Sequence, residues 1–178
     1  MRITSDLFAA FLKCPTKCWL RSRGEAGAGN AYADWVRTQN ESYRSENAKR
    51  VLEAVPQNEY VTSPLATENP KLAKWRLAVN MPAESQTLES LLHAVERVPP
   101  EGRGKPAQFI PIRFVFTNKL TKDDRLLVSY DALVLSEVLG WEVRLGKIIH
   151  GDDPATLKVK TSTQRAKVRK RIEKLTSL

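Results

Sequence analysis

The sequence is poor in cysteine and histidine, and it contains no long apolar run. Cys14 and Cys18 are the only cysteines among 178 residues, and there are two histidines. Two cysteines do not make the disulfide framework of a small secreted protein. No apolar run approaches the ~18 residues of a membrane-spanning helix, and residues 1–13 lack the order of a signal peptide. We therefore expect reduced thiols and a cytoplasmic protein.

Several motifs that carry chemistry are also missing. The glycine-containing segment 24–29 lacks the Gly-Lys-Ser/Thr ending of a phosphate-binding P-loop. Neither histidine lies beside a nucleophile in the sequence, so no Ser/His/Asp or Cys/His arrangement can be argued. His150, Asp152 and Asp153 do not have the spacing of a standard metal site, and a polar turn accounts for them.

What the sequence does have is positive charge, unevenly distributed. The net charge is +9, and residues 158–178 hold eight Lys or Arg and one Glu. Such a block binds nucleic acid because its cations displace the counterions condensed on phosphates. We predict contact with DNA here, with a solvated face or an acidic protein partner as alternatives. The candidate DNA-binding residues are Lys158, Lys160, Arg165, Lys167, Arg169, Lys170, Arg171 and Lys174.

The apolar periodicity predicts one α/β or α+β domain over residues 1–178, with a mixed central sheet flanked by helices. Helices are expected within 1–55, a sheet with one helix within 74–160, and a basic helix within 162–178. Pro111 lies inside a predicted strand, which favours an edge strand or a bulge. The expected helices are 3–12, 15–20, 31–55, 121–139 and 162–175, and the expected strands are 75–79, 88–98, 108–116, 142–150 and 156–160.

Three segments, taken in order, resemble a known family. The opening ITSDLFAAFLKCPTKCWLR (3–21), the strand FIPIRF (109–114) and the helix LLVSYDALVLSEVLG (126–140) resemble RecB-like nucleases of the PD-(D/E)XK superfamily. The resemblance is to the branch that includes the CRISPR-associated RecB-type exonucleases. It implies a restriction-endonuclease-like core that cuts DNA with Mg²⁺ or Mn²⁺, held by carboxylates and assisted by a lysine. It also implies a helicase or another DNA-processing protein as a partner.

Carried over residue by residue, the resemblance places unsuitable side chains at the catalytic positions. The acidic position of the first core strand falls on His93, and that of the second falls on Pro111. The lysine position falls on Arg113, while the helical tyrosine is matched by Tyr130. Proline cannot bind a metal and arginine does not lose its proton near neutral pH. We therefore predict a DNA-binding domain with weak or lost cleavage.

Two other functions stay open at this point. The catalytic carboxylates could have moved to Glu89, Glu96 or Asp131, which would give an active Mg²⁺- or Mn²⁺-dependent nuclease. In a strand, Glu89 and His93 would share one face and could make half of a metal site. The candidate catalytic set is therefore Glu89, His93, Glu96, Arg113 and Tyr130. The third function is a non-catalytic scaffold subunit whose basic end docks an acidic partner.

The resemblance also bears on the two cysteines as metal ligands. Related nucleases hold an iron-sulfur cluster with one N-terminal cysteine and three C-terminal ones, and Cys14 matches the first. Such a cluster needs four thiolates, so here it requires cysteines from outside this chain. Cys18 is a second thiol or a small buried residue. Either the cluster has been lost, or the chain is the N-terminal piece of a longer protein.

Overall fold

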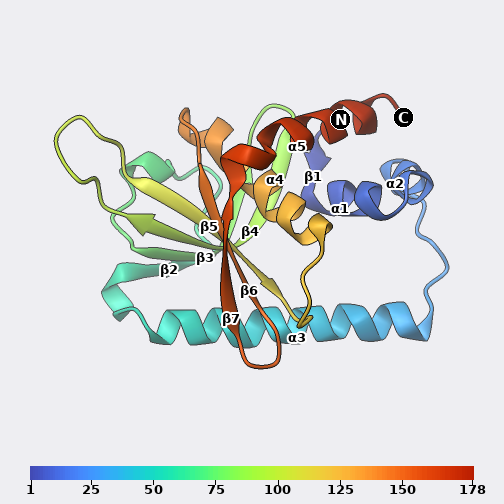
Figure 1. The fold of residues 1–178 in the computed structure, drawn as a ribbon, viewed down its shortest axis with the longest axis horizontal. Helices are drawn as coiled ribbons and strands as arrows, with labels where there is room; N and C mark the ends of the chain where they lie inside the picture. Colours follow the sequence, from blue (N-terminus) through green and yellow to red (C-terminus); the bar gives the residue numbers. More distant parts are fainter.

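The computed structural model describes residues 1–178 and confirms a mixed α/β architecture, with helices on both faces of one sheet (Figure 1). The helices are α1 (Ser5–Lys13), α2 (Pro15–Ser22), α3 (Ala31–Glu53), α4 (Lys122–Leu139) and α5 (Thr161–Thr176), with short 3₁₀ turns at Gln57–Glu59 and Pro70–Leu72. The strands are β1 (Ile3–Thr4), β2 (Tyr60–Thr62), β3 (Leu77–Glu84), β4 (Leu88–Val98), β5 (Gln108–Val115), β6 (Leu145–His150) and β7 (Ala155–Lys160). No helix combines the length and apolarity that a membrane crossing requires.

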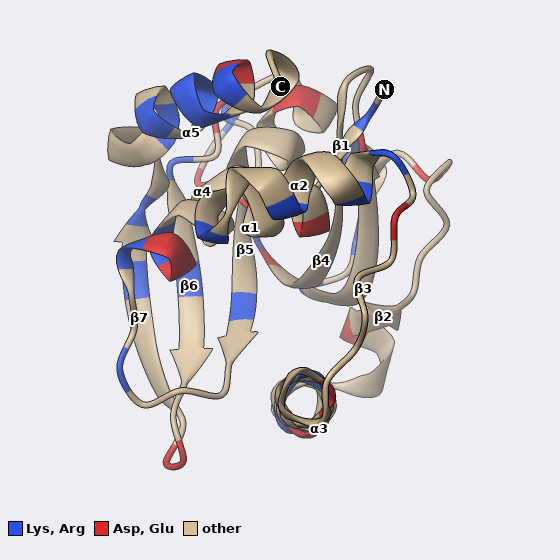
Figure 2. Ribbon diagram, turned by 90° about the vertical axis from the view of Figure 1, so that its right-hand side faces the viewer, with Lys and Arg blue, Asp and Glu red and all other residues tan.

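The sheet runs in the order β2-β3-β4-β5-β6-β7, with β1 paired to β4. The strand β5, the helix α4 and the parallel strand β6 form a βαβ unit, while the β3-β4, β4-β5 and β6-β7 pairs are antiparallel. The larger core lies between the sheet and α1, α4 and α5, and a smaller core lies under α3. Figure 2 shows α3 end-on and apart from the other helices.

Local sequence signals explain where the helices begin and end. The Thr121 hydroxyl accepts from the backbone N–H of Asp124, whose carboxylate in turn accepts from the Thr121 N–H, so α4 begins with a capping box. Gly140 ends α4 in a left-handed conformation with φ of 81°. Thr4 caps α1, and Asn30 caps α3.

The structure corrects four expectations about the strands. The strand expected at 75–79 begins at Leu77 and continues to Glu84. Ile3 and Thr4 form a strand rather than the first turn of a helix, because they pair with Leu88 and Glu89 of β4. Pro111 lies neither on an edge strand nor at a bulge, since β5 has β4 and β6 as neighbours and its register with β4 is unbroken from Gln108 to Ile112. Its missing N–H is tolerated because paired register with β6 begins one residue later, at Ile112. The strand expected from Glu142 begins only at Leu145.

One edge of β4 is shared by two strands, and this leaves a split in the sheet. The opposite edge of β4 pairs with β3. On the shared edge, β1 pairs with Leu88 and Glu89, while β5 pairs with residues from Ala94 to Val98. Residues 90–93 have a strand neighbour on one side only. The split therefore opens beside the start of α1, which follows β1 directly.

Gly146 on β6 lies where three elements approach one another closely. A Cβ built there would lie 2.9 Å from a Val128 methyl of α4 and 3.1 Å from the Thr161 methyl of α5. Both neighbours are buried and β-branched, so they adjust poorly. We expect Gly146→Ala to lower the free energy of unfolding by about 1–3 kcal/mol, measured by urea unfolding. Gly27→Ala is the matched control because no atom lies within 4 Å of its added Cβ. Equal stabilities of the two variants would contradict this packing.

Candidate functional site

An ion pair between β5 and α4 lies beside the split in the sheet. Arg113 donates from Nε to Oδ2 of Asp131 (2.7 Å) and from Nη2 to Oδ1 (3.1 Å). The Ser90 hydroxyl of β4 also donates to Asp131 Oδ1 (2.7 Å). The side chains of Arg113 and Asp131 are 13% and 2% exposed. Because a buried carboxylate is tolerated only when it is paired and hydrogen-bonded, Asp131 is committed to these two partners.

His93 and Asn80 face each other at a place where both strands are irregular. The pairs Val79–Ala94 and Met81–Leu92 lie on either side of them in the β3-β4 ladder. Asn80 has a left-handed backbone with φ of 52°. On the other side of β4, His93 Nδ1 accepts a hydrogen bond from the Phe114 backbone N–H (3.1 Å). The imidazole thus replaces a backbone partner where β4 and β5 separate.

Both strands change faces at this point. Ala78 and Met81 are three residues apart, yet both lie in the larger core, and the same is true of Leu92 and Val95. In a regular strand, residues three apart point to opposite faces. The irregularity at Asn80 and His93 therefore reverses the alternation on the two strands together.

Arg44 of α3 reaches this point from the helix that covers the smaller core. Its Nη2 donates to Oδ1 of Asn80 (2.7 Å), and the side chain is partly buried. No carboxylate lies within ion-pair distance of Arg44, unlike Arg113. We refer to Arg44, Asn80, Ser90, His93, Arg113 and Asp131 as the polar cluster.

Burial and like charge set the protonation of the polar cluster. Burial lowers the pKa of His93 well below its ordinary 6.5, and the charges of Arg113 and Arg44 lower it further. His93 is therefore neutral near pH 7, and because Nδ1 accepts a hydrogen bond, the proton lies on Nε2. Burial also lowers the pKa of Arg44. For Arg113, burial acts in the same direction, but Asp131 outweighs it and raises the pKa.

Tyr130 lies beside the polar cluster but has a different set of partners. Its hydroxyl is 2.7 Å from the carbonyl oxygen of Ile3 and 3.2 Å from that of Glu89. Its ring is buried and stacks on Phe8 with centroids 4.7 Å apart. Burial raises the pKa of Tyr130, so the phenol keeps its proton at neutral pH. Tyr130 therefore joins α4 to β1 and β4.

The structure does not bring the predicted carboxylates together. Glu96 pairs with Lys147 at 2.6 Å, while Glu89 lies 3.9 Å from Arg2 and is 42% exposed. No group of three or more His, Cys, Asp or Glu side chains could hold a metal ion. The only carboxylate of the polar cluster, Asp131, is taken by Arg113. The residues at this position therefore do not fit a Mg²⁺ or Mn²⁺ site.

The two cysteines occupy different environments at the start of α2. Cys14 is exposed and immediately precedes the helix, whereas Cys18 is 1% exposed and belongs to the larger core. Burial raises the pKa of the Cys18 thiol, which Arg21 partly offsets. Both thiols are free. Cys18 packs as a small apolar residue, and no further cysteine in the chain could join Cys14 in holding a cluster.

The predicted DNA-binding residues lie on β7 and on α5, which follows it directly. Arg165 lies 3.6 Å from Glu142, and its side chain is 33% exposed. The other seven are exposed and belong to no ion pair: Lys158, Lys160, Lys167, Arg169, Lys170, Arg171 and Lys174.

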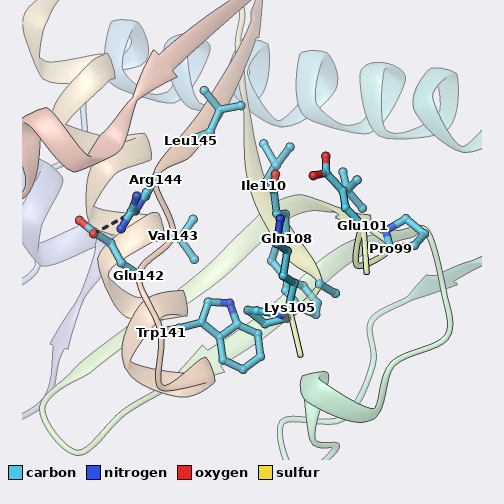
Figure 3. A pocket seen from close by; sticks show the side chains of 14 residues that line it. Pro99, Glu101, Lys105, Gln108, Ile110, Trp141, Glu142, Val143, Arg144 and Leu145 are labelled. Carbon is cyan, nitrogen blue, oxygen red and sulfur yellow. Dashed lines mark ion pairs between the residues drawn. The ribbon is translucent and has the colours of Figure 1, made fainter. Parts of the chain in front are cut away.

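The two main cavities lie away from the polar cluster. One, of about 390 Å³, lies at the start of β5, where Trp141, Gln108 and Lys105 line it together with the Glu142–Arg144 ion pair (3.3 Å; Figure 3). The other, of about 370 Å³, lies near the end of α3. Neither is lined by a residue of the polar cluster, so the candidate site rests on its side chains rather than on a deep pocket.

Sequence reasoning identified part of the polar cluster and missed the rest. His93 and Arg113 were predicted as candidate catalytic residues. In the structure they lie opposite each other when the β4-β5 register is extended by one residue. Asp131 was considered only as a relocated metal ligand. Arg44 and Asn80 were missed because nothing in the local pattern sets them apart. No known protein-family model matches the chain, and neither does any curated protein sequence.

Removing one partner of the buried ion pair should destabilise the protein far more than removing one partner of an exposed pair. We expect Asp131→Ala to lower the free energy of unfolding by about 3–5 kcal/mol, because it leaves Arg113 charged, buried and unpaired. A double-mutant cycle with Arg113→Ala, followed by urea unfolding, measures the coupling. The control cycle uses Asp34 and Arg37, an exposed pair at 3.0 Å on α3, where about 0.5 kcal/mol or less is expected. Equal couplings in the two cycles would refute the assignment.

His93 should make stability depend on pH. Its pKa is lowered in the folded state, so below its ordinary value of 6.5 the unfolded chain takes up a proton that the folded chain resists. The contribution of neutral His93 to the free energy of unfolding is therefore fully present above pH 6.5. It decreases as the pH falls, by at most about 1.4 kcal/mol per pH unit. We expect His93→Gln to show a smaller decrease than the wild type in urea unfolding at about pH 7.5 and about pH 5.5. Parallel decreases would contradict the burial of a neutral imidazole.

Proposed function

We propose that the chain is a DNA-binding domain with a RecB-like nuclease arrangement, that it has weak or no cleavage activity, and that α5 is its main contact with phosphates. The observation that carries this proposal is a set of five exposed cations on α5 that belong to no ion pair. These are Lys167, Arg169, Lys170, Arg171 and Lys174.

The way α5 packs favours a binding surface over a solvated face. Val168 and Leu175, seven residues apart, are buried in the larger core, and Ile172 packs against it. This stripe fixes the helix to the body of the protein and leaves the rest of its circumference to cations. Glu173 is the only acidic residue on α5. A helix held rigidly presents its charges to a phosphate backbone with little loss of conformational freedom.

Neighbouring elements extend the positive surface. α5 contacts α1, which in turn contacts α2. Lys17, Arg21 and Arg23 are exposed on or next to α2, and Figure 2 shows basic segments on both α2 and α5. The Arg23 guanidinium lies 4.3 Å from the centroid of the Trp19 ring. Phosphate contacts over two helices would give affinity without sequence specificity.

The polar cluster supports the second half of the proposal. Hydrolysis by two metal ions needs several carboxylate ligands at one point. Here one carboxylate is neutralised by Arg113, and the neighbouring positions carry His93 and Arg44. Positive guanidiniums repel a divalent cation and attract a phosphate. The same residues that disfavour cleavage therefore favour holding DNA.

DNA binding should depend steeply on salt, and α5 should account for much of that dependence. We expect Arg169→Gln/Lys170→Gln to weaken binding of a DNA duplex and to reduce the slope of log K against log salt by about 2. Fluorescence anisotropy at several salt concentrations measures both. The matched control is Arg103→Gln/Lys105→Gln, which removes the same charge from the exposed loop between β4 and β5 and should change neither quantity.

Two results would contradict the proposed function. A flat salt response of the wild type would argue against phosphate binding by a basic surface. Degradation of the duplex by the wild type in Mg²⁺ or Mn²⁺, lost in Arg113→Ala or Glu89→Ala, would argue for an active nuclease with relocated carboxylates.

A further inference from the structure

Arg44 is a partly buried cation without a counter-ion. Its one hydrogen bond to a side chain is to the neutral amide of Asn80. The nearest acidic influences are Asp131, which Arg113 already neutralises, and Asp6, an exposed residue of α1 that forms no ion pair. Arginines withdrawn from water are ordinarily balanced by a carboxylate or a phosphate. No carboxylate of the protein pairs directly with Arg44, so its guanidinium remains able to take an oxyanion from outside.

Several N–H groups around Arg44 also have no acceptor within the protein. His93 donates nothing from Nε2, the Asn80 amide donates nothing, and Arg113 uses only Nε and Nη2. The only buried side-chain nitrogen or oxygen atoms without a partner are Arg97 Nε and His150 Nδ1. The free N–H groups of the cluster are therefore open to solvent rather than sealed in the core.

These donors come from elements that meet around His93, the residue of β4 that lies beside the split in the sheet. Arg44 of α3 is bonded to Asn80 of β3, which lies opposite His93 of β4. Arg113 of β5 lies opposite His93 when the β4-β5 register is extended by one residue, and the N–H of the next residue, Phe114, donates to His93 Nδ1 (3.1 Å). The site thus offers guanidinium, imidazole and amide N–H groups. Of the two carboxylates that act on both guanidiniums, Asp131 is already bound to Arg113, and Asp6 is exposed on α1 and pairs directly with neither arginine.

We propose that Arg44, Asn80, His93 and Arg113 form a binding site for a phosphate group. A phosphate oxyanion takes several N–H donors at once, and guanidinium groups suit its geometry. The site needs no metal ion, because fixed cations take the place of one. This inference rests on the proposed function where the phosphate belongs to DNA; a free phosphate would use the same donors. α5 then holds the backbone from outside while this site receives one phosphate at the split.

The two histidines make the site directly observable. We would follow the imidazole resonances of His93 and His150 by NMR at constant pH while adding inorganic phosphate or a short DNA duplex. In the wild type we expect a saturable shift of His93. Arg44→Gln should weaken phosphate binding at least about tenfold, the loss expected for charge-assisted hydrogen bonds. Arg50→Gln is the matched control, since it removes one exposed charge from the same helix and should leave the response unchanged.

Comparing the two ligands identifies the source of the phosphate, and a second variant at Arg44 keeps the test valid if the first does not fold. A His93 shift with the duplex assigns the site to DNA phosphates, whereas a shift with free phosphate alone assigns it to a small anion; both support a phosphate site. Arg44→Lys keeps the charge and should bind several-fold more weakly than the wild type, so it tests the site even if Arg44→Gln fails to fold.

The failures of the two proposals can be told apart. If the duplex binds through α5 but neither ligand shifts His93, or if Arg44→Gln responds like Arg50→Gln, the phosphate site is overturned and the proposed function stands. If free phosphate shifts His93 but no DNA binds, the site stands and the proposed function fails.

Discussion

The ion pair between Arg113 and Asp131 connects the two elements on which the rest of the structure depends. β5 lies in the interior of the sheet, and α4 packs against both β5 and β6 as the crossover of a βαβ unit. Two charges withdrawn from water at this junction are tolerable only together. Neither residue can therefore be changed alone without a large cost, and the chemistry of the site is constrained by the stability of the fold.

That constraint is the basis of our proposal for what the split in the sheet binds. A divalent cation needs free carboxylates, whereas a phosphate needs free N–H donors. Because Asp131 already balances Arg113, the groups that remain without a partner at this point are N–H donors. Arg44 has no carboxylate within ion-pair distance, and His93 is neutral. Under the function that we propose, holding DNA and cutting it are separable properties of one arrangement of strands, and the side chains at the split suit the first.

The elements with strong local signals were predictable from the sequence. The strand 88–98 was predicted with its observed bounds, because its apolar residues are framed by turn residues. The helix expected at 121–139 is confirmed as α4, whose two ends carry a capping box and Gly140. The two-residue strand β1 was not predictable, since it exists only through its pairing with β4. Pro111 was misjudged because its tolerance depends on where the register with β6 begins.

The candidate site was predictable only in part, for a related reason. The resemblance singled out His93 and Arg113 along the chain, but it could not show that Asp131 would be consumed by an ion pair. The contribution of Arg44 depends on how α3 crosses the sheet, thirty-six residues away from Asn80 in sequence. Such long-range contacts have no signature in a single sequence.

Because β3 and β4 change faces at the same point, the lengths of the two strands on either side of that point depend on each other. An extra or missing residue on one strand alone would turn the residues on one side of the irregularity toward the wrong layer: Ala78 would leave the larger core if β3 changed, and Val95 would leave it if β4 changed. Only a compensating change on the other strand would restore the alternation. An insertion or deletion in one strand of the hairpin is therefore compatible with the fold only when the other strand carries a matching change.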